Sequence, residues 1–192
     1  MALITSNERI AGGIYRMALT GVTPGRAGQF LELHPDDGSM LLPRPISIFD
    51  FDEASNTTRL VYRTVGRGTA LFAGMKPGDA LRVTGPLGNG FPAAGGNAVI
   101  IGGGLGVAPL YLLIKTLRAS DPSRHISVYL GYSGEVFLED EFAALADVLV
   151  CDVGGYITDK ADFDADATFY ACGPAMMLRA AAQKAMDRRK TL

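Results

Sequence analysis

A glycine-rich turn between an apolar run and a helical pattern offers chemistry for a phosphate group. Residues 99–101 are aliphatic and predict a short buried strand, which ends abruptly at the turn Gly102-Gly-Gly-Leu-Gly106. From Ala108 the pattern is helical, and Pro109 suits the first helical turn. Backbone N–H groups and the helix dipole favour an anion there, and missing Cβ atoms allow a pyrophosphate to approach. The alternative is a plain tight turn. Pro109 departs from the usual G-x-G-x-x-G pattern and indicates a different dinucleotide-binding lineage.

A second candidate is the run Arg44-Pro45-Ile46-Ser47, in which prolines flank the arginine. The two prolines stiffen the backbone, so the guanidinium is presented in a restricted position from which it can hold a phosphate with two hydrogen bonds. The Ser47 hydroxyl can hydrogen-bond a heteroatom of a ring system. The alternative is an edge strand that carries a solvated arginine.

A third candidate, Gly66-Arg67-Gly68-Thr69, repeats the arrangement of a glycine turn that leads into a helix. Thr69 has an alternative role as a simple helix N-cap. One phosphate-type turn in each half of the chain indicates two bound nucleotides, which a non-catalytic fold does not readily explain.

Cys172 is the fourth candidate, because it ends a predicted strand just before a helix that Pro174 opens. It therefore lies at the carboxyl edge of the predicted sheet, where open α/β sheets bind their ligands. The alternative is a small buried apolar cysteine. Cys151 also ends a predicted strand and is interpreted as a packing residue.

Residues 1–92 have the pattern of a small antiparallel β-barrel, with many short strands between turns. Predicted turns include Pro24–Gly28 and Pro35–Gly38, and Asp50–Asn56 is predicted as a hairpin loop. The predicted strands are Arg9–Leu19 (broken at Gly12-Gly13), Gln29–His34, Pro43–Ile48, Thr57–Val65 and Ala80–Thr84, with a short helix after Gly66.

Residues 93–192 alternate strands and helices, which predicts an α/β domain with a parallel sheet. The loop Gly85–Pro92 bridges the two halves. The predicted strands are Ala98–Ile101, Ile126–Leu130, Val148–Cys151 and Thr168–Ala171, and the predicted helices are Ala108–Ala119, Glu139–Leu145 and Pro174–Asp187.

Composition excludes several classes of function. The net charge is −2 and the only basic run is Arg188-Arg189-Lys190, so a nucleic-acid surface is not expected. Residues 98–114 carry no charge, but four glycines and a proline argue against a membrane span. The N-terminus has no apolar signal core, and we expect a cytoplasmic protein. Two cysteines and two histidines are too few for a structural metal site, so no metal is expected.

Six motifs in a fixed order resemble the ferredoxin–NADP reductase superfamily, and most of all its dihydroorotate dehydrogenase class 1B electron-transfer subunits. The resemblance covers nearly the whole chain. The motifs are Arg44-Pro-Ile-Ser47, Val61-Tyr-Arg63, Gly66-x-Gly68-Thr69, Gly85-Pro-Leu-Gly-Asn-Gly-Phe91, Gly102-Gly-Gly-Leu-Gly-Val-Ala-Pro109 and Cys172-Gly-Pro174.

The resemblance implies an FAD-binding barrel followed by an NAD-binding α/β domain, with hydride transfer between nicotinamide and flavin. It implies that Arg44 contacts an FAD phosphate and that Ser47, with Pro45 and Ile46 beside it, contacts the isoalloxazine. Val61, Tyr62 and Arg63 would line the flavin and ribityl chain, and Gly68 and Thr69 would hold the pyrophosphate. Gly102, Gly103, Gly104 and Gly106 would receive the NAD pyrophosphate, and Cys172, Gly173 and Pro174 would lie near the nicotinamide. Ser47 and Cys172 are the expected catalytic positions.

The sequence departs from the family at two places. Asp152–Asp159 resembles a shortened version of a family loop on the nicotinamide side. The resembling subunits also have a C-terminal domain in which four cysteines bind a [2Fe–2S] cluster, and no cysteine follows Cys172 here. We therefore expect FAD without iron, and electron transfer to artificial acceptors or oxygen rather than to a partner that needs the cluster.

The function expected from these residues is electron transfer between NAD(H) and a partner, either a catalytic redox subunit or another electron carrier. A stand-alone NAD(P)H–flavin reductase is one alternative, and a degenerate nucleotide-binding module without redox turnover is another. Gly131-Tyr-Ser-Gly-Glu135, after the second strand of the α/β domain, has no arginine to pair with a 2′-phosphate. The sequence therefore favours NAD over NADP.

Overall fold

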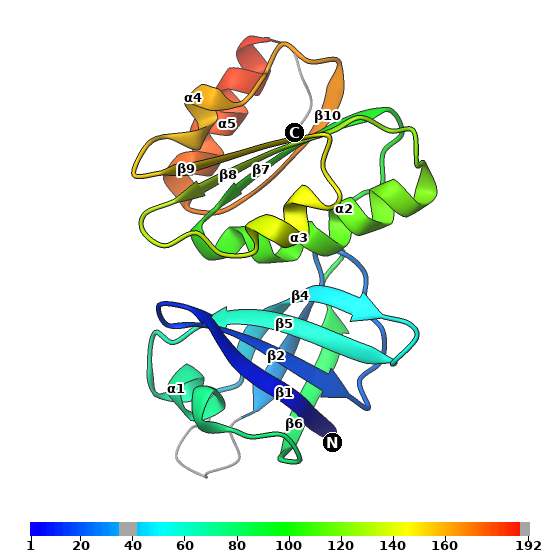
Figure 1. Cartoon of the computed structure of the whole chain (residues 1–192), viewed down its shortest axis with the longest axis vertical. Helices are drawn as coiled ribbons and strands as arrows, with labels where there is room; N and C mark the ends of the chain where they lie inside the picture. Colours follow the sequence, from blue (N-terminus) through cyan, green and yellow to red (C-terminus); the bar gives the residue numbers. More distant parts are fainter. Residues whose placement is uncertain (35–41, 189–192) are drawn as a thin grey trace. The chain divides into compact units, whose positions relative to one another are not determined.

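Strands of the first half of the chain close into an antiparallel barrel in the computed structural model, which describes residues 1–34 and 42–188 (Figure 1). The strand order is β1-β2-β5-β4-β3-β6, and β1 pairs with β6 to close the barrel. The expected turn Pro35–Gly38 lies outside the described residues, as do Arg189 and Lys190. The elements are β1 (Ala2–Ala11), β2 (Ile14–Thr20), β3 (Phe30–His34), β4 (Arg44–Asp52), β5 (Thr57–Arg63), α1 (Arg67–Gly74) and β6 (Ala80–Leu87).

Three barrel strands, β1, β4 and β6, extend beyond their predicted bounds, whereas β3 and β5 are slightly shorter than predicted. β1 begins at Ala2, and β6 continues through Gly85 to Leu87 into the predicted bridging loop. The prediction of a hairpin loop from Asp50 is also wrong, because β4 runs to Asp52. Asp50 is buried opposite Arg59 of β5, whose guanidinium lies 2.7 Å from its carboxylate, and this ion pair lets a charged residue remain inside the strand.

The second half of the chain forms a parallel sheet with the strand order β10-β7-β8-β9. The chain divides into the units Met1–Phe91 and Pro92–Leu192, so the boundary lies one residue before the expected one. Figure 1 shows α2 and α3 on one face of the sheet and α4 and α5 on the other. The elements are β7 (Asn97–Gly103), η1 (Gly104–Val107), α2 (Ala108–Ser120), β8 (Ile126–Tyr132), α3 (Glu139–Ala143), β9 (Val148–Val153), α4 (Ile157–Lys160), β10 (Ala167–Cys172) and α5 (Ala175–Asp187).

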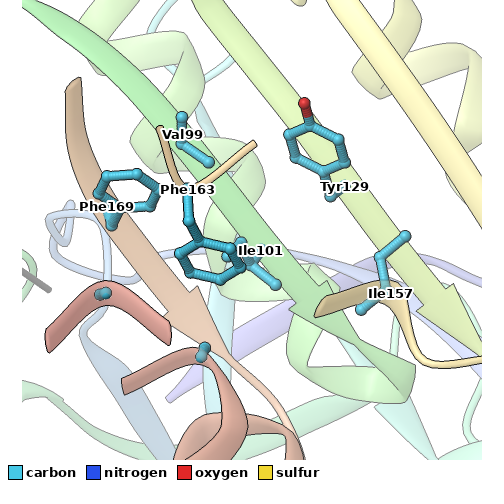
Figure 2. Packing of buried hydrophobic residues seen from close by; sticks show 8 residues of the cluster. Val99, Ile101, Tyr129, Ile157, Phe163 and Phe169 are labelled. Atoms are coloured by element: carbon cyan, nitrogen blue, oxygen red, sulfur yellow. The ribbon is translucent and has the colours of Figure 1, made fainter. Parts of the chain in front are cut away.

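Buried side chains fix this sheet against its helices. On the α4 and α5 face, Val99 and Ile101 of β7 pack with Phe163 and Phe169, whose rings stack with centroids 5.4 Å apart (Figure 2). Ala181 and Ala185 of α5 lie against the same cluster, and their small side chains allow the helix a close approach. Val99 and Ile101 are two positions apart on β7 and therefore face the same side of the sheet.

Two elements of this unit are absent from the sequence prediction. The 3-10 helix η1 occupies the glycine turn itself, and the short helix α4 begins at Ile157, within the segment that resembles a shortened family loop and the residues after it. Pro109 lies in the first turn of α2, as predicted. Within the described residues, no helix is both long and apolar enough to cross a membrane.

Candidate cofactor sites in the two units

Arg44, the first residue of β4, lies against the N-terminus of α1 in the barrel unit, although the two belong to separate segments of the sequence. A Cβ atom added to Gly68 would lie 2.7 Å from Nε and 3.2 Å from Cζ of Arg44, so the guanidinium passes directly over this glycine. Nη1 of Arg44 donates to the carbonyl oxygens of Leu42 (2.7 Å) and Pro43 (3.3 Å), which orients the side chain. The structure therefore joins two of the predicted phosphate motifs into one positively charged corner.

Thr69 uses its hydroxyl within the turn that begins α1. Oγ1 accepts from the backbone N–H groups of Val65 (2.9 Å) and Gly66 (3.3 Å) and donates to the Gly66 carbonyl (3.1 Å). The side chain is buried, so its role is to shape the turn. The alternative that Thr69 is the N-cap is wrong in its position, because Gly66 is the N-cap and Thr69 is the third helical residue, whose hydroxyl accepts from the N-cap N–H. The prediction that Thr69 holds a pyrophosphate then concerns its backbone N–H at the helix N-terminus.

The three residues at the end of β5 differ in exposure. The side chains of Val61 and Tyr62 are 2% and 0% exposed, whereas Arg63 is exposed. Tyr62 stacks on Tyr15 with ring centroids 5.7 Å apart and therefore belongs to the barrel core. Arg63 is thus the side chain of the three that can line a ligand, and the prediction for Val61 and Tyr62 is limited to their backbone groups.

The predicted flavin-side residues of β4 lie in one strand segment next to Arg44. Pro45 is exposed, and Ile46 and Ser47 are half-buried. Ser47 lies opposite Phe30 of β3 in the strand register. The barrel unit therefore carries Arg44, Ser47 and Gly68, while the glycine turn and Cys172 lie in the other unit.

The four glycines of the second unit have different tasks. A Cβ at Gly102 would meet Val107 at 2.9 Å, one at Gly103 would meet Met177 at 2.6 Å, and one at Gly106 would meet the Cys172 carbonyl at 2.5 Å. These three glycines are required by protein packing. Gly104 has a φ of +53°, and no heavy atom lies within 4 Å of its Cβ position. Its backbone is the part of the turn that a phosphate can approach.

Cys172 is the last residue of β10 and pairs with Gly102 of β7, as the sequence predicts for the carboxyl edge of the sheet. Gly173 lies against Gly103, since its added Cβ would be 3.0 Å from the Gly103 nitrogen, and Pro174 precedes the first residue of α5. The two predicted ligand segments of this unit are therefore in direct backbone contact. Cys151 differs from its prediction, because β9 continues past it to Val153.

Both thiols are neutral at physiological pH. Burial raises the pKa of the half-buried Cys172 thiol above its ordinary value. Burial and the nearby Glu139 carboxylate raise the pKa of Cys151 to about 11. A protonated Cys172 is a poor nucleophile and instead supplies shape and weak polarity at the sheet edge.

The Cys172→Ala variant should retain FAD and its fold but reduce the flavin more slowly with NADH. We expect a loss on the order of ten-fold, because misplacing a reactant slows transfer while the thiol itself exchanges no electrons. Anaerobic stopped-flow absorbance at the visible flavin band measures this step. Cys151→Ala is the matched control, and equal rates in wild type and Cys172→Ala would assign Cys172 to packing alone.

The residues present fit a flavin nucleotide in the first unit and a pyridine nucleotide in the second. Gly68 lies beneath a guanidinium at a helix N-terminus, and Gly104 leaves its backbone open after a parallel strand. Among residues 1–34 and 42–188, no three histidine, cysteine or acidic side chains lie close enough to hold a metal ion.

A closed antiparallel barrel followed by a parallel sheet, each with a glycine turn before a helix, defines the class of two-domain reductases of the ferredoxin–NADP reductase type. Solved structures agree with this class. The NADH-dependent reduced ferredoxin-NADP oxidoreductase superposes with a TM-score of 0.83 and 26% identity, over 97% of this chain and 72% of that chain. The Amycolatopsis cytochrome P450 reductase superposes with a TM-score of 0.80 and 26% identity, over 99% of this chain and 66% of that one.

Sequence relatives define the family more narrowly. The chain is 39% identical over 191 residues to the electron transfer subunit of dihydroorotate dehydrogenase B (NAD(+)) from Streptococcus mutans, covering 92% of this chain and 74% of the relative. The same subunit from Bacillus cereus is 39% identical over 197 residues, covering 93% and 75%. No protein-family model matches the chain. The chain belongs to the family of dihydroorotate dehydrogenase B electron transfer subunits, which confirms the expected fold class and the expected class of electron-transfer oxidoreductase.

Proposed function

We propose that this chain is an FAD-containing electron-transfer subunit that moves electrons between NAD(H) and a partner redox protein. The observation that carries the proposal is that one chain of this family has two candidate phosphate-binding turns, one in each unit. The first is the turn at Gly68, over which the Arg44 guanidinium lies, and the second is the turn at Gly104, whose backbone is open to a ligand. Two nucleotides, one for each unit, account for both.

Each unit contributes positioning rather than reactive groups. When bound, FAD supplies the capacity to exchange hydride with a nicotinamide and to release electrons singly. Arg44 and the N-terminus of α1 hold the diphosphate, and Ser47 on the same strand β4 as Arg44 presents a hydroxyl to the ring system. Cys172 and Gly173 shape the nicotinamide side, where a neutral thiol keeps the edge free of charge.

The segment that ends β8 and the three residues after it support NAD rather than NADP as the pyridine nucleotide. Gly131-Tyr-Ser-Gly-Glu135 ends in an acidic residue and has no arginine. A carboxylate suits the free 2′-hydroxyl of NAD and repels the 2′-phosphate of NADP. The relatives are named as the electron transfer subunit of dihydroorotate dehydrogenase B (NAD(+)). The proposed partner is therefore a catalytic redox subunit that oxidises dihydroorotate. The proposal places the protein in the cytoplasm, where Cys151 and Cys172 stay reduced.

Two measurements on the FAD-loaded chain test this function. NADH should reduce a one-electron dye in a reaction that requires FAD, and the chain should co-migrate with a dihydroorotate-oxidising subunit during gel filtration. Dye reduction without any association would support the stand-alone reductase instead. Failure to take up FAD would support the degenerate nucleotide-binding module.

A further inference from the structure

Asn7 of β1 makes three hydrogen bonds with one carboxamide group. Nδ2 donates to the carbonyl oxygens of Phe72 (2.7 Å) and Met75 (2.9 Å), and Oδ1 accepts from the Tyr62 hydroxyl (3.0 Å). Phe72 lies in the last turn of α1 and Met75 is its C-cap residue. Asn7 therefore ties the C-terminal end of α1 to two strands of the barrel, β1 and β5.

Helix α1 needs such an anchor because it has only eight residues. Helices of this length are marginal in water, and the last carbonyl groups of a helix lack their usual partners four residues on. At this end of α1 the Phe72 carbonyl accepts from the cap N–H of Met75 (3.1 Å). Asn7 adds a second donor to the Phe72 carbonyl and a donor to the Met75 carbonyl, and the buried Phe72 ring packs edge-on against Tyr62 with centroids 6.4 Å apart. The position of α1 is thus set at its C-terminal end by Asn7, Tyr62 and Phe72.

The opposite end of the same helix carries Gly68 beneath the Arg44 guanidinium. Eight residues of helix span about 12 Å, so a tilt at the anchored end displaces the N-terminal N–H groups directly. We propose that Asn7 is a positioning residue for the FAD diphosphate, which acts through α1 and does not itself touch the cofactor. The inference rests on the proposed function, since it assumes that the α1 N-terminus receives the FAD diphosphate.

The chemistry at this position suits asparagine in particular. Burial raises the pKa of the Tyr62 phenol above its ordinary value, so the phenol stays protonated and donates to Oδ1. That hydrogen bond turns the two N–H donors of Asn7 toward the helix carbonyls. An aspartate would present a carboxylate to two carbonyl oxygens, with no proton between them.

The Asn7→Asp variant tests the proposal through the pH dependence of FAD affinity. At about pH 8 the ionised carboxylate repels both carbonyls, and we expect FAD affinity to fall about ten-fold relative to wild type. The carbonyl oxygens raise the pKa of the introduced carboxyl group. As the pH falls to about 5.5, protonation restores one donor, and the variant should regain part of the lost affinity relative to wild type.

Two controls separate positioning from general stability. Thr5 lies in β1 like Asn7, but its hydroxyl donates to the Ala18 carbonyl of β2. Thr5→Val removes that hydrogen bond and should leave FAD affinity unchanged. Tyr62→Phe keeps the ring and removes only the donor that orients Asn7, so it should weaken FAD binding by a few-fold, as loss of one neutral hydrogen bond does. This milder variant carries the test if Asn7→Asp does not fold.

Hydrogen exchange of residues 67–74 provides a readout without FAD, and it should be faster in Asn7→Asp at high pH than in Thr5→Val. Wild-type protein that takes up no FAD would contradict the proposed function itself. The role of Asn7 would be overturned by a different result, in which wild type binds FAD. In that result the ratio of Asn7→Asp to wild-type FAD affinity would not change with pH, and the hydrogen exchange of α1 would be the same in both proteins.

Discussion

Gly106→Ala should destabilise the α/β unit and weaken its nucleotide binding together, because two backbone segments meet at this glycine. An added Cβ would lie 2.5 Å from the Cys172 carbonyl oxygen and 2.6 Å from the Gly173 Cα. Backbone atoms cannot rotate away as a flexible side chain can, so the turn between β10 and α5 must shift. We expect an overpacking cost of about 1–3 kcal/mol in the free energy of unfolding. NADH affinity should fall at least about ten-fold, since both ligand segments move.

Urea unfolding and titration with NAD(H) measure these two effects on the same variant. Gly95→Ala is the matched control, because it lies in the same unit and its added Cβ meets no heavy atom within 4 Å. FAD affinity should be unchanged in both variants. If Gly106→Ala keeps the stability and the NADH affinity of wild type, the glycine turn after β7 and the turn between β10 and α5 are not held in contact.

Arg44→Ala should weaken FAD binding much more than NAD(H) binding. The guanidinium is held over the α1 N-terminus by two carbonyls of its own chain, so it presents its charge to a ligand there without reorganising. Loss of a charge-assisted phosphate contact costs roughly 1.5–3 kcal/mol, or about one to two decades in affinity. Isothermal titration with FAD and with NAD(+) measures both affinities, and Arg9→Ala removes an exposed arginine of the same unit as a control.

Gly68→Ala tests the same corner without removing a charge. Its added Cβ would lie 2.7 Å from Arg44 Nε, so the guanidinium must move. Alanine is favoured over glycine inside a helix by up to about 1 kcal/mol, so stability should be kept or raised while FAD affinity falls. If both Arg44→Ala and Gly68→Ala bind FAD as tightly as wild type, Arg44 does not contact the FAD phosphate and is a solvated arginine of a strand.

Local signals explain why the α/β unit was predicted closely. Each of its strands is a short, mostly apolar run, and α2 and α5 have uninterrupted helical patterns. Cys172 could be placed at the sheet edge because it follows directly on such a run. Pro109 marked the first turn of α2 by its chemistry alone.

Contacts distant in sequence explain what could not be predicted. Asn7 and Phe72 are 65 positions apart, and nothing in the pattern around Asn7 indicates that it anchors a helix. An aspartate such as Asp50 predicts a loop from sequence alone. In the structure its ion pair with Arg59 allows it to lie in β4. The glycine motif does not show which of its glycines have which role. In the structure the backbone of Gly104 is open to a ligand, whereas packing leaves no room for a side chain at Gly102, Gly103 and Gly106. That distinction depends on which side chains fill the space around each glycine.

The visible spectrum of the purified chain, recorded with FAD before and after anaerobic addition of NADH, tests the central claim most directly. The account predicts stoichiometric flavin absorbance bands that bleach when NADH is added and return when a one-electron dye or oxygen is admitted. Arg44→Ala should lose the bands on dialysis more readily than wild type. A wild-type chain that shows no flavin bands after incubation with FAD, or whose bands NADH leaves unchanged, would contradict the account.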